Sequence, residues 1–163
     1  MEILQYSEEF KDQVISLILH IQREEFGLSI SLSDQPDLEN IFEFYIENGG
    51  GFWISKHGES IVGTIALLNL GGGQYALRKM FVKTGFRGSE YCIAKNLLAH
   101  AEKWALIQKK ATAIYLGTTE RFIAAHKFYR KNGYIELEKA MLPTSFPVMF
   151  VDKLFFMKAL TSR

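Results

Sequence analysis

The sequence predicts an α/β (α+β) fold in which a mixed central sheet of about seven strands is flanked by four helices. Two observations indicate this class. Stretches with helical periodicity precede three consecutive β-rich stretches, and helical and β-rich stretches then alternate to the end of the chain. The 163 residues suit one domain, and neither a linker nor an internal repeat is visible. We therefore expect a single domain over residues 1–163.

The first third of the chain is predicted to be mostly helical after an initial strand. Residues 7–25 carry apolar side chains at helical spacing, and Ser7 with two following acids is a favourable helix start. Pro36 suits the first turn of a second helix, which three glycines at 49–51 end. The apolar stripe of that helix consists of Leu38, Ile41, Phe42 and Tyr45.

Three antiparallel strands are predicted next, because their residues are rich in β-branched and aromatic types and are separated by glycine-containing turns. The predicted strands cover residues 52–56, 60–68 and 74–82. A helix over 91–108, a strand over 113–116, a helix over about 120–132 and strands over about 134–140 and 148–158 follow.

The strand at 74–82, the next helix and the strand at 113–116 form a β-α-β crossover, whose strands should be parallel. A ligand in such a unit usually lies near the N-terminus of the crossover helix.

The composition excludes several classes of protein. Nineteen basic and 18 acidic residues give a formal charge of +1, which argues against broad binding of nucleic acid or anionic membranes. One cysteine, Cys92, excludes an intrachain disulfide, and the four histidines lack metal-ligand spacing, so we expect no metal. No apolar run approaches the ~18 residues of a membrane span, and the N-terminus does not resemble a secretory signal. A cytoplasmic protein is expected.

The segment from Val82 to Ala94 is the best candidate for a ligand site. It leads from a strand into a helix through small residues, so that backbone N–H groups and the helix dipole converge there, an arrangement that suits phosphate groups. Arg87 would add a cation beside the phosphates or pair with a nearby acid. By spacing alone, roughly half of such glycine-containing turns would have a structural role only and would bind no ligand.

This segment resembles motif A of the GNAT acetyltransferase superfamily, which has Val, four residues, Arg-Gly-x-Gly-x-Gly/Ala and then a helix with paired leucines. Val82, Arg87, Gly88 and the pair Leu97-Leu98 match this pattern. Residues 125–134 are similar to motif B of the same family, with its aromatic-Tyr pair and closing Gly-aromatic. The predicted order of elements is also that of the family. The resemblance therefore implies the GNAT fold and one N-acetyltransferase domain.

The resemblance implies acetyl-CoA as cosubstrate and a primary amine as acceptor, without a covalent enzyme intermediate. Tyr129 would be the general acid that protonates the leaving CoA thiolate. A backbone amide at Phe81 or Met80 would polarise the thioester carbonyl. The residues implied to bind acetyl-CoA are Met80, Phe81, Val82, Arg87, Gly88, Ser89, Cys92, Ile93, Ala94 and Thr118.

The loop departs from the family pattern after Gly88. It is about two residues longer, which places Cys92 at one glycine position of the motif and Ala94 at the last. Glu90 brings a carboxylate toward the phosphate site, and we expect it to point outward because like charges repel.

Two family side chains are also missing. Phe122 stands where the family often has an asparagine, so Thr118 or Thr119 would supply that contact. The strand at 74–82 lacks the glutamate base of many relatives, so a base would act through water or lie elsewhere, with Glu24 and Glu25 as candidates.

The acceptor stays open between a small amine, a polyamine and a peptide or protein amine. The first two helices, the loop at 27–37 and the loop at 141–147 would form its binding wall. A polyamine would suit an acidic cleft, and candidates for one are Asp34, Asp37, Glu39, Glu43 and Glu47, which equally suit a solvated helix surface.

Three further possibilities concern Tyr129, catalysis and assembly. Tyr129 also suits a core aromatic position, and the alternative to an enzyme is a non-catalytic acyl-CoA-binding module with the same fold. A homodimer is plausible through the exposed edge of the strand at 148–158.

Overall fold

The structure is a computed structural model that describes residues 1–161. Within these residues seven strands form one mixed sheet in the order β1-β2-β3-β4-β5-β7-β6, which confirms the predicted fold class. The chain divides into two compact units. The first comprises Met1–Leu68 and Arg78–Lys103, and the second comprises Asn69–Leu77 and the residues from Trp104 onward.

The first unit begins with β1 (Glu2–Gln5) and a helical segment over the residues predicted. The segment changes its winding twice, from a 3-10 turn (η1, Glu8–Phe10) through α1 (Lys11–His20) to a π-helical turn (η2, Ile21–Glu25). Its apolar face is buried, as the periodicity predicted. The Ser7 hydroxyl makes no cap to the backbone and donates instead to the Glu9 carboxylate at 3.2 Å.

The predicted second helix is interrupted. After a 3-10 turn (η3, Leu32–Asp34), α2 covers only Pro36–Glu39, and a π-helical turn (η4, Phe42–Ile46) follows a break at Asn40. Three members of the predicted stripe are buried, but Phe42 is exposed, so its assignment to the stripe was wrong. The break and the wider π-helical turn change the angles between side chains from those of a regular α-helix.

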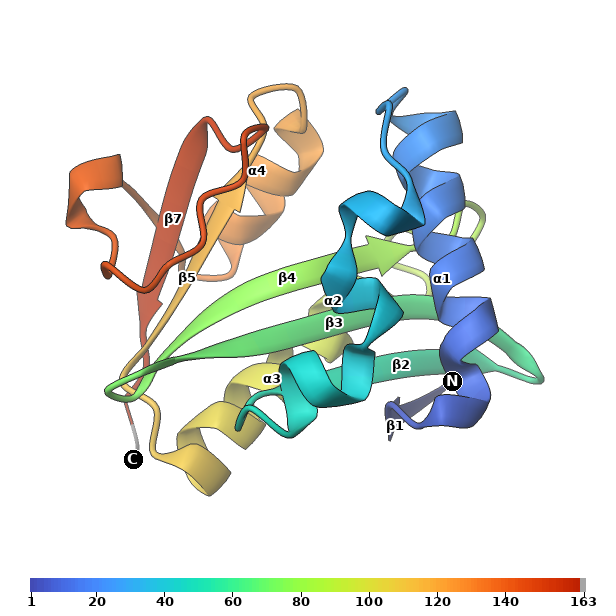
Figure 1. Cartoon of the computed structure of the whole chain (residues 1–163), viewed down its shortest axis with the longest axis horizontal. Helices are drawn as coiled ribbons and strands as arrows, with labels where there is room; N and C mark the ends of the chain where they lie inside the picture. The colour runs from blue at the N-terminus through green and yellow to red at the C-terminus, as the bar shows by residue number, and fades with distance from the viewer. Residues whose placement is uncertain (162–163) are drawn as a thin grey trace. The chain divides into compact units, whose positions relative to one another are not determined.

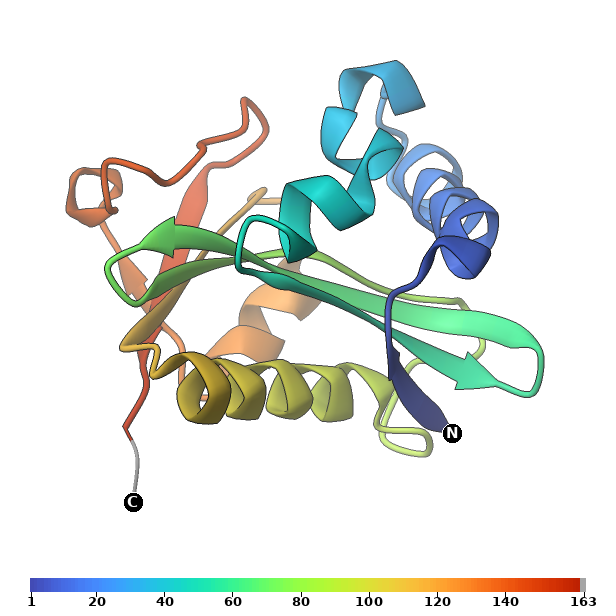
Figure 2. The same ribbon diagram turned by 60° about the horizontal axis from the view of Figure 1, so that its bottom comes forward.

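The next three strands confirm the prediction: β2 (Gly51–His57), β3 (Ser60–Gly71) and β4 (Gln74–Val82). β2 pairs antiparallel with both β1 and β3. In the first unit, α1 and α2 cover one face of these strands (Figure 1) and α3 (Ile93–Lys109) runs along the opposite face (Figure 2). Gly63 permits this approach, since a Cβ there would lie 2.8 Å from Ile93 Cγ2 and 3.0 Å from Leu97 Cδ1.

The second unit contains the start of β4 and the remaining strands. There β4 pairs parallel with β5 (Ala113–Thr118), which confirms the predicted crossover. The later elements are α4 (Ile123–Lys131), β6 (Ile135–Leu137), a 3-10 turn (η5, Lys139–Met141) and β7 (Leu154–Ala159).

The expectation of an exposed edge at 148–158 was wrong. The last strand starts only at Leu154, because residues before it form a turn in which the Met149 N–H donates to the Asp152 carboxylate at 2.9 Å. β7 also lies between β5 and β6, so both of its edges are paired. This strand therefore gives no support to a homodimer.

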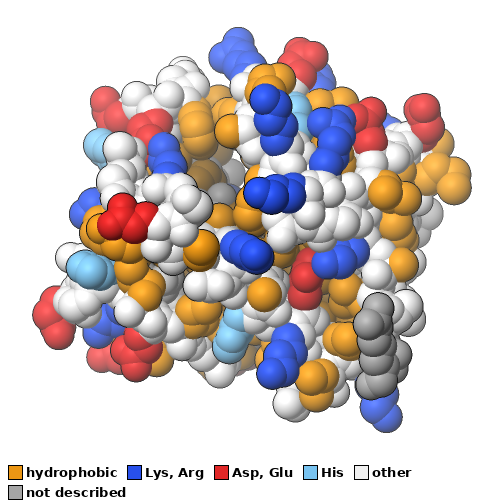
Figure 3. All heavy atoms as spheres, turned by 180° about the vertical axis from the view of Figure 1, so that it is seen from behind, with side chains coloured by type: hydrophobic (Ala, Val, Ile, Leu, Met, Phe, Trp, Pro, Cys, Tyr) orange, Lys and Arg blue, Asp and Glu red, His pale blue; other side chains and the backbone are white. Residues whose placement is uncertain are grey.

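The surface mixes charge types. The face drawn in Figure 3 carries basic, acidic and hydrophobic side chains next to one another, in keeping with the formal charge of +1. Among residues 1–161, no helix is both long enough and apolar enough to span a membrane. No group of three or more His, Cys, Asp or Glu residues in the same range could hold a metal ion.

Candidate active site

The loop between β4 and α3 folds into tight turns. Gly85 and Gly88 have φ angles of +92° and +102°, which glycine adopts without steric cost. A Cβ added at either glycine would meet no atom within 4 Å, so the backbone here is open to close approach. Cys92, at φ +53°, closes the last turn: its N–H donates to the Gly88 carbonyl at 3.2 Å, and its thiol donates to the Ser89 carbonyl at 2.9 Å.

The helix α3 begins directly after this turn, at Ile93. The first N–H groups of a helix have no partner inside the helix, and the helix dipole makes that end positive. The predicted residues Gly88, Ser89, Cys92, Ile93 and Ala94 therefore lie together in one turn and helix start that fits an anionic group. Glu90 is exposed, as expected.

The Arg87 side chain binds Glu25 from η2. Its guanidinium makes two contacts with the carboxylate, at 2.8 Å and 3.1 Å, and its Nε donates to the Val82 carbonyl at 2.7 Å. The Thr84 hydroxyl donates to the same carboxylate at 2.8 Å. We call Glu25, Thr84 and Arg87 the loop cluster. Of the two roles considered for Arg87, the structure shows the pairing with an acid.

These contacts make Glu25 a poor candidate for the general base. Burial alone would raise the pKa of its carboxyl, but the hydrogen bonds from Arg87 and Thr84 outweigh this effect and hold the pKa below its ordinary value of 4.5. A carboxylate stabilised in its ionised form is a weak proton acceptor.

Aromatic side chains also fix the loop. The Phe86 ring lies 5.2 Å from the rings of both His57 and Tyr91, and His57 belongs to the end of β2. The sequence did not indicate this packing, because His57 and Phe86 belong to separate elements and neither stands in a recognisable motif.

The end of β4 presents Met80, Phe81 and Val82, which are all half-buried. The strand is distorted directly before them, since Lys79 has a φ of +51°. The Thr64 hydroxyl of β3 holds this distortion by donating to the Lys79 carbonyl at 2.7 Å.

A buried group of polar side chains surrounds Lys79, and sequence reasoning missed it. The Asp37 carboxylate lies 3.5 Å from the Lys79 ammonium and 3.8 Å from the Arg78 guanidinium, and it accepts a hydrogen bond from the Tyr45 hydroxyl at 2.6 Å. The Lys79 ammonium also donates to Gln35 at 2.7 Å. We call Gln35, Asp37, Tyr45, Arg78 and Lys79 the buried cluster. The sequence feature that could have indicated this cluster is the pair of adjacent cations, Arg78 and Lys79, in the otherwise largely apolar strand 74–82.

The same contacts weaken the idea of an acidic cleft for a polyamine. Asp37 is buried and already faces two cations. Asp34 accepts hydrogen bonds from the backbone N–H and the hydroxyl of Ser31, both at 2.9 Å. Two of the five acids are therefore engaged within their own unit.

In the second unit, Tyr129 lies on the buried side of α4. Its ring packs against those of Phe128, Tyr134 and Phe156, with centroid distances of 5.7, 5.8 and 6.1 Å. Burial raises the pKa of its hydroxyl to about 12. The residue therefore has the core position considered from the sequence, and its hydroxyl stays protonated at neutral pH.

Thr118, the predicted substitute for the missing asparagine, is buried at the end of β5, and its carbonyl accepts from the Lys153 N–H at 2.8 Å. The Thr119 carbonyl lies 2.8 Å from His126 Nε2. His126 is therefore buried and hydrogen-bonded within its own unit.

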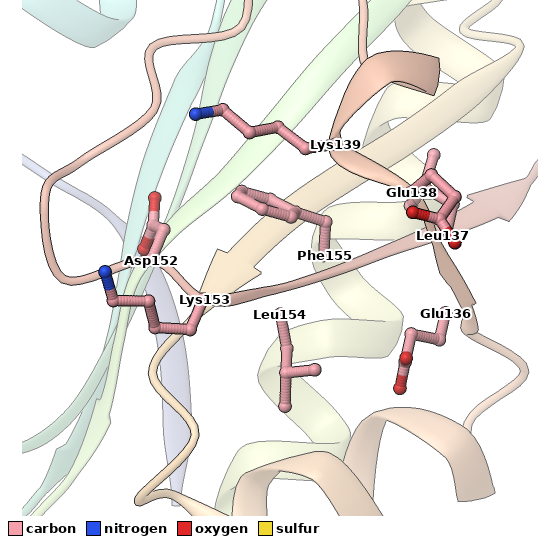
Figure 4. Close-up of a pocket in the computed structure, with 8 residues that line it drawn as sticks. All are labelled: Glu136, Leu137, Glu138, Lys139, Asp152, Lys153, Leu154 and Phe155. Carbon is pink, nitrogen blue, oxygen red and sulfur yellow. The ribbon is translucent and has the colours of Figure 1, made fainter.

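The second unit also has a hollow of about 520 Å³ beside β6 and β7 (Figure 4). It contains none of the predicted site residues. Its lining is Glu136, Leu137, Glu138, Lys139, Asp152, Lys153, Leu154 and Phe155.

Comparison with known proteins identifies the family. Residues 15–134 match the model of the acetyltransferase (GNAT) family. The chain belongs to this family. The structure is similar to an acetyltransferase of the GNAT family from Staphylococcus aureus Mu50, with 40% sequence identity, a TM-score of 0.92 and coverage of 98% of this chain and 99% of that one. A PaiA N-acetyltransferase from Thermoplasma acidophilum, solved in complex with coenzyme A, shares the fold at 17% identity, with a TM-score of 0.75 and 98% coverage of both chains.

Curated relatives are longer proteins. The chain is 33% identical over 102 residues to the N-acetylaspartate synthetase of Xenopus tropicalis and 32% identical over 127 residues to that of Danio rerio. These matches cover 61% and 74% of this chain but 36% and 43% of the relatives. The matched region thus spans less than half of their length.

Proposed function

We propose that the protein is a single-domain N-acetyltransferase that transfers the acetyl group of acetyl-CoA to a primary amine by direct attack in a ternary complex. Family membership and the CoA complex of a protein with the same fold support acetyl-CoA as the donor. The observation that carries the proposal is the position of Tyr129, which lies on the buried side of α4 in the segment that resembles motif B.

The chemistry needs a proton donor at the leaving group. The neutral amine attacks the thioester carbonyl carbon, a C–N bond forms, and the C–S bond then breaks with its electron pair on sulfur. In our proposal the thiolate takes the proton of Tyr129, the surplus amine proton goes to water, and water reprotonates the phenolate. A hydroxyl with a pKa of about 12 is protonated at pH 7 and remains available as this donor.

The first unit would bind the donor through its backbone. Amides from Arg87 to Ala94, apart from that of Cys92, which donates to Gly88, would hold the pyrophosphate. The β4 backbone from Met80 to Val82 would pair with the pantetheine arm, and one of its amides would polarise the thioester carbonyl. Thr118 would contact the pantetheine arm in place of the missing asparagine. The Arg87 side chain would act indirectly, because its contacts with Glu25 hold the loop.

A non-catalytic acyl-CoA-binding module is the second candidate. The pairing of Arg87 with Glu25 favours it, since the loop arginine then directs its side chain at a carboxylate. This candidate requires binding of acetyl-CoA without turnover. A cytoplasmic location stays a prediction for either candidate.

The test combines binding with two tyrosine variants. Titration calorimetry of acetyl-CoA and CoA should give Kd values in the micromolar range, which correspond to a binding free energy of about −8 kcal/mol. With an amine panel as acceptors, Tyr129→Phe should lower kcat on the order of 100-fold while the Kd of acetyl-CoA stays nearly unchanged. Tyr75→Phe is the matched control, because Tyr75 is also a buried tyrosine of the second unit whose pKa burial raises.

The outcomes separate the candidates. An unchanged kcat in Tyr129→Phe would contradict the role of this hydroxyl as the acid. Micromolar acetyl-CoA binding without transfer to any amine would favour the module, and absence of binding would refute both candidates.

A further inference from the structure

Arg78 and Lys79 follow one another on β4, yet both reach the same carboxylate. Successive side chains of a regular strand point to opposite faces of the sheet. The left-handed backbone of Lys79, at φ +51°, breaks this alternation, so that both cations lie within 4.0 Å of Asp37, at 3.8 and 3.5 Å. Such a conformation is unfavourable for a residue with a Cβ, and strain of this kind is concentrated at functional sites.

Neighbouring side chains hold Lys79 in this conformation. The buried Thr64 hydroxyl fixes its carbonyl at 2.7 Å. Gln35 and Gln22 exchange two hydrogen bonds, at 2.9 and 3.0 Å, which orients the Gln35 oxygen that accepts from the Lys79 ammonium. The position of the Lys79 ammonium is therefore determined twice, by the contact of Thr64 with the Lys79 backbone and by the contact of Gln35 with the ammonium itself.

The buried cluster does not fully compensate the Lys79 ammonium. An ammonium has three N–H donors, and here it faces two acceptors, Gln35 and Asp37. The single charge of Asp37 is shared with Arg78, and Tyr45 also donates to this carboxylate. Burial lowers the pKa of Lys79, an effect that Asp37 opposes and Arg78 reinforces. A further anion would stabilise the charged form.

The cations are the more accessible part of the cluster. The side chains of Arg78 and Lys79 are 14% and 9% exposed, against 5% for Asp37. Lys79 also directly precedes Met80, in the strand segment proposed to bind the donor, and neighbouring strand residues are only about 3.3 Å apart along the strand. An acceptor bound at Lys79 would thus lie within a few residues of the proposed reaction centre.

We propose that Lys79 binds a carboxylate of the acceptor, so that the acceptor is an amino acid or another amine that carries a carboxylate. This inference rests on the N-acetyltransferase function proposed above. The acceptor carboxylate would accept a hydrogen bond from the third N–H of the Lys79 ammonium and place a second negative charge beside it. Acetyl transfer to the amine of the same molecule would leave this carboxylate unchanged.

The first experiment compares matched acceptors with the unmodified protein. L-Alanine is paired with L-alaninamide and L-aspartate with L-asparagine, and kcat/KM is calculated per neutral amine so that different amine pKa values do not bias the ratio. A charge-assisted contact predicts that at least one acid exceeds its paired amide, in which one carboxylate is replaced, by about 10- to 100-fold. Equal use of acids and amides would overturn the inference and leave the proposed function standing. Absence of transfer to every amine would refute the proposed function itself.

Variants then assign the preference to Lys79. Lys79→Met should abolish the preference through a higher KM for the acid, whereas Lys79→Arg should retain part of it. Lys103→Met removes an exposed lysine from α3 and is the control that should keep the unmodified ratio. A preference that survives in a folded Lys79→Met variant would overturn the inference. If Lys79→Met does not fold, Lys79→Arg decides, and a preference for acids as large in this variant as in the unmodified protein would overturn the inference.

Discussion

The loop cluster and the buried cluster of the first unit both combine carboxylates with basic side chains, but they differ in depth and geometry. Arg87 and Glu25 are 44% and 21% exposed and form a two-pronged ion pair at 2.8 and 3.1 Å. Asp37 is 5% exposed and faces its two cations at the longer distances of 3.5 and 3.8 Å. Water screens the exposed pair, whereas the buried charges depend on one another. We therefore expect the exposed pair, despite its shorter contacts, to contribute less to the free energy of unfolding than the buried charges do.

The largest effect should come from Asp37→Asn. This variant keeps the shape of the side chain but leaves two poorly solvated cations without their shared counter-charge, which should lower the free energy of unfolding by about 3–5 kcal/mol. Glu25→Gln, the corresponding change in the loop cluster, should lower it by about 1 kcal/mol at most. Urea unfolding monitored by circular dichroism measures both. Equal losses in the free energy of unfolding would show that the deeper burial of Asp37 does not make its charge contacts more important for stability than those of Glu25.

The sequence predicted these clusters unequally, because periodicity and turn residues report local structure only. Strands at 52–56, 60–68 and 74–82 were found since glycine turns separate them, and the start of α3 was found since it follows a recognisable loop. The pairing of Arg87 with Glu25 joins residues 62 positions apart, and no local pattern encodes it. The left-handed Lys79 was equally hidden, because that conformation usually indicates glycine.

A smaller effect should appear in cofactor affinity when the loop cluster is broken. Glu25→Gln releases the Arg87 side chain and the Thr84 hydroxyl, so the loop must be ordered when acetyl-CoA binds, and the Kd should rise about three- to tenfold. Titration calorimetry measures this change. Glu24→Gln is the control, since it removes an exposed carboxylate from the adjacent position of η2. Tighter binding in Glu25→Gln would instead mean that freed Arg87 contacts the phosphates directly.

The smallest effect should be the pH dependence of the Arg87–Glu25 pair. The pKa of Glu25 in the folded protein lies below its ordinary value of 4.5, despite burial, because Arg87 and Thr84 hydrogen-bond the ionised form. Folding therefore favours the ionised carboxylate, and this stabilisation is complete above pH 4.5 and is lost as the pH falls through the lower folded pKa. Since Glu25 is partly exposed, the whole contribution should stay below about 1 kcal/mol.

A double-mutant cycle of Glu25→Gln and Arg87→Gln, measured by urea unfolding at about pH 7 and about pH 3, should show a coupling energy that shrinks at the lower pH. A coupling energy that is the same at both pH values would mean that the contacts at 2.8 and 3.1 Å act through shape and not through charge.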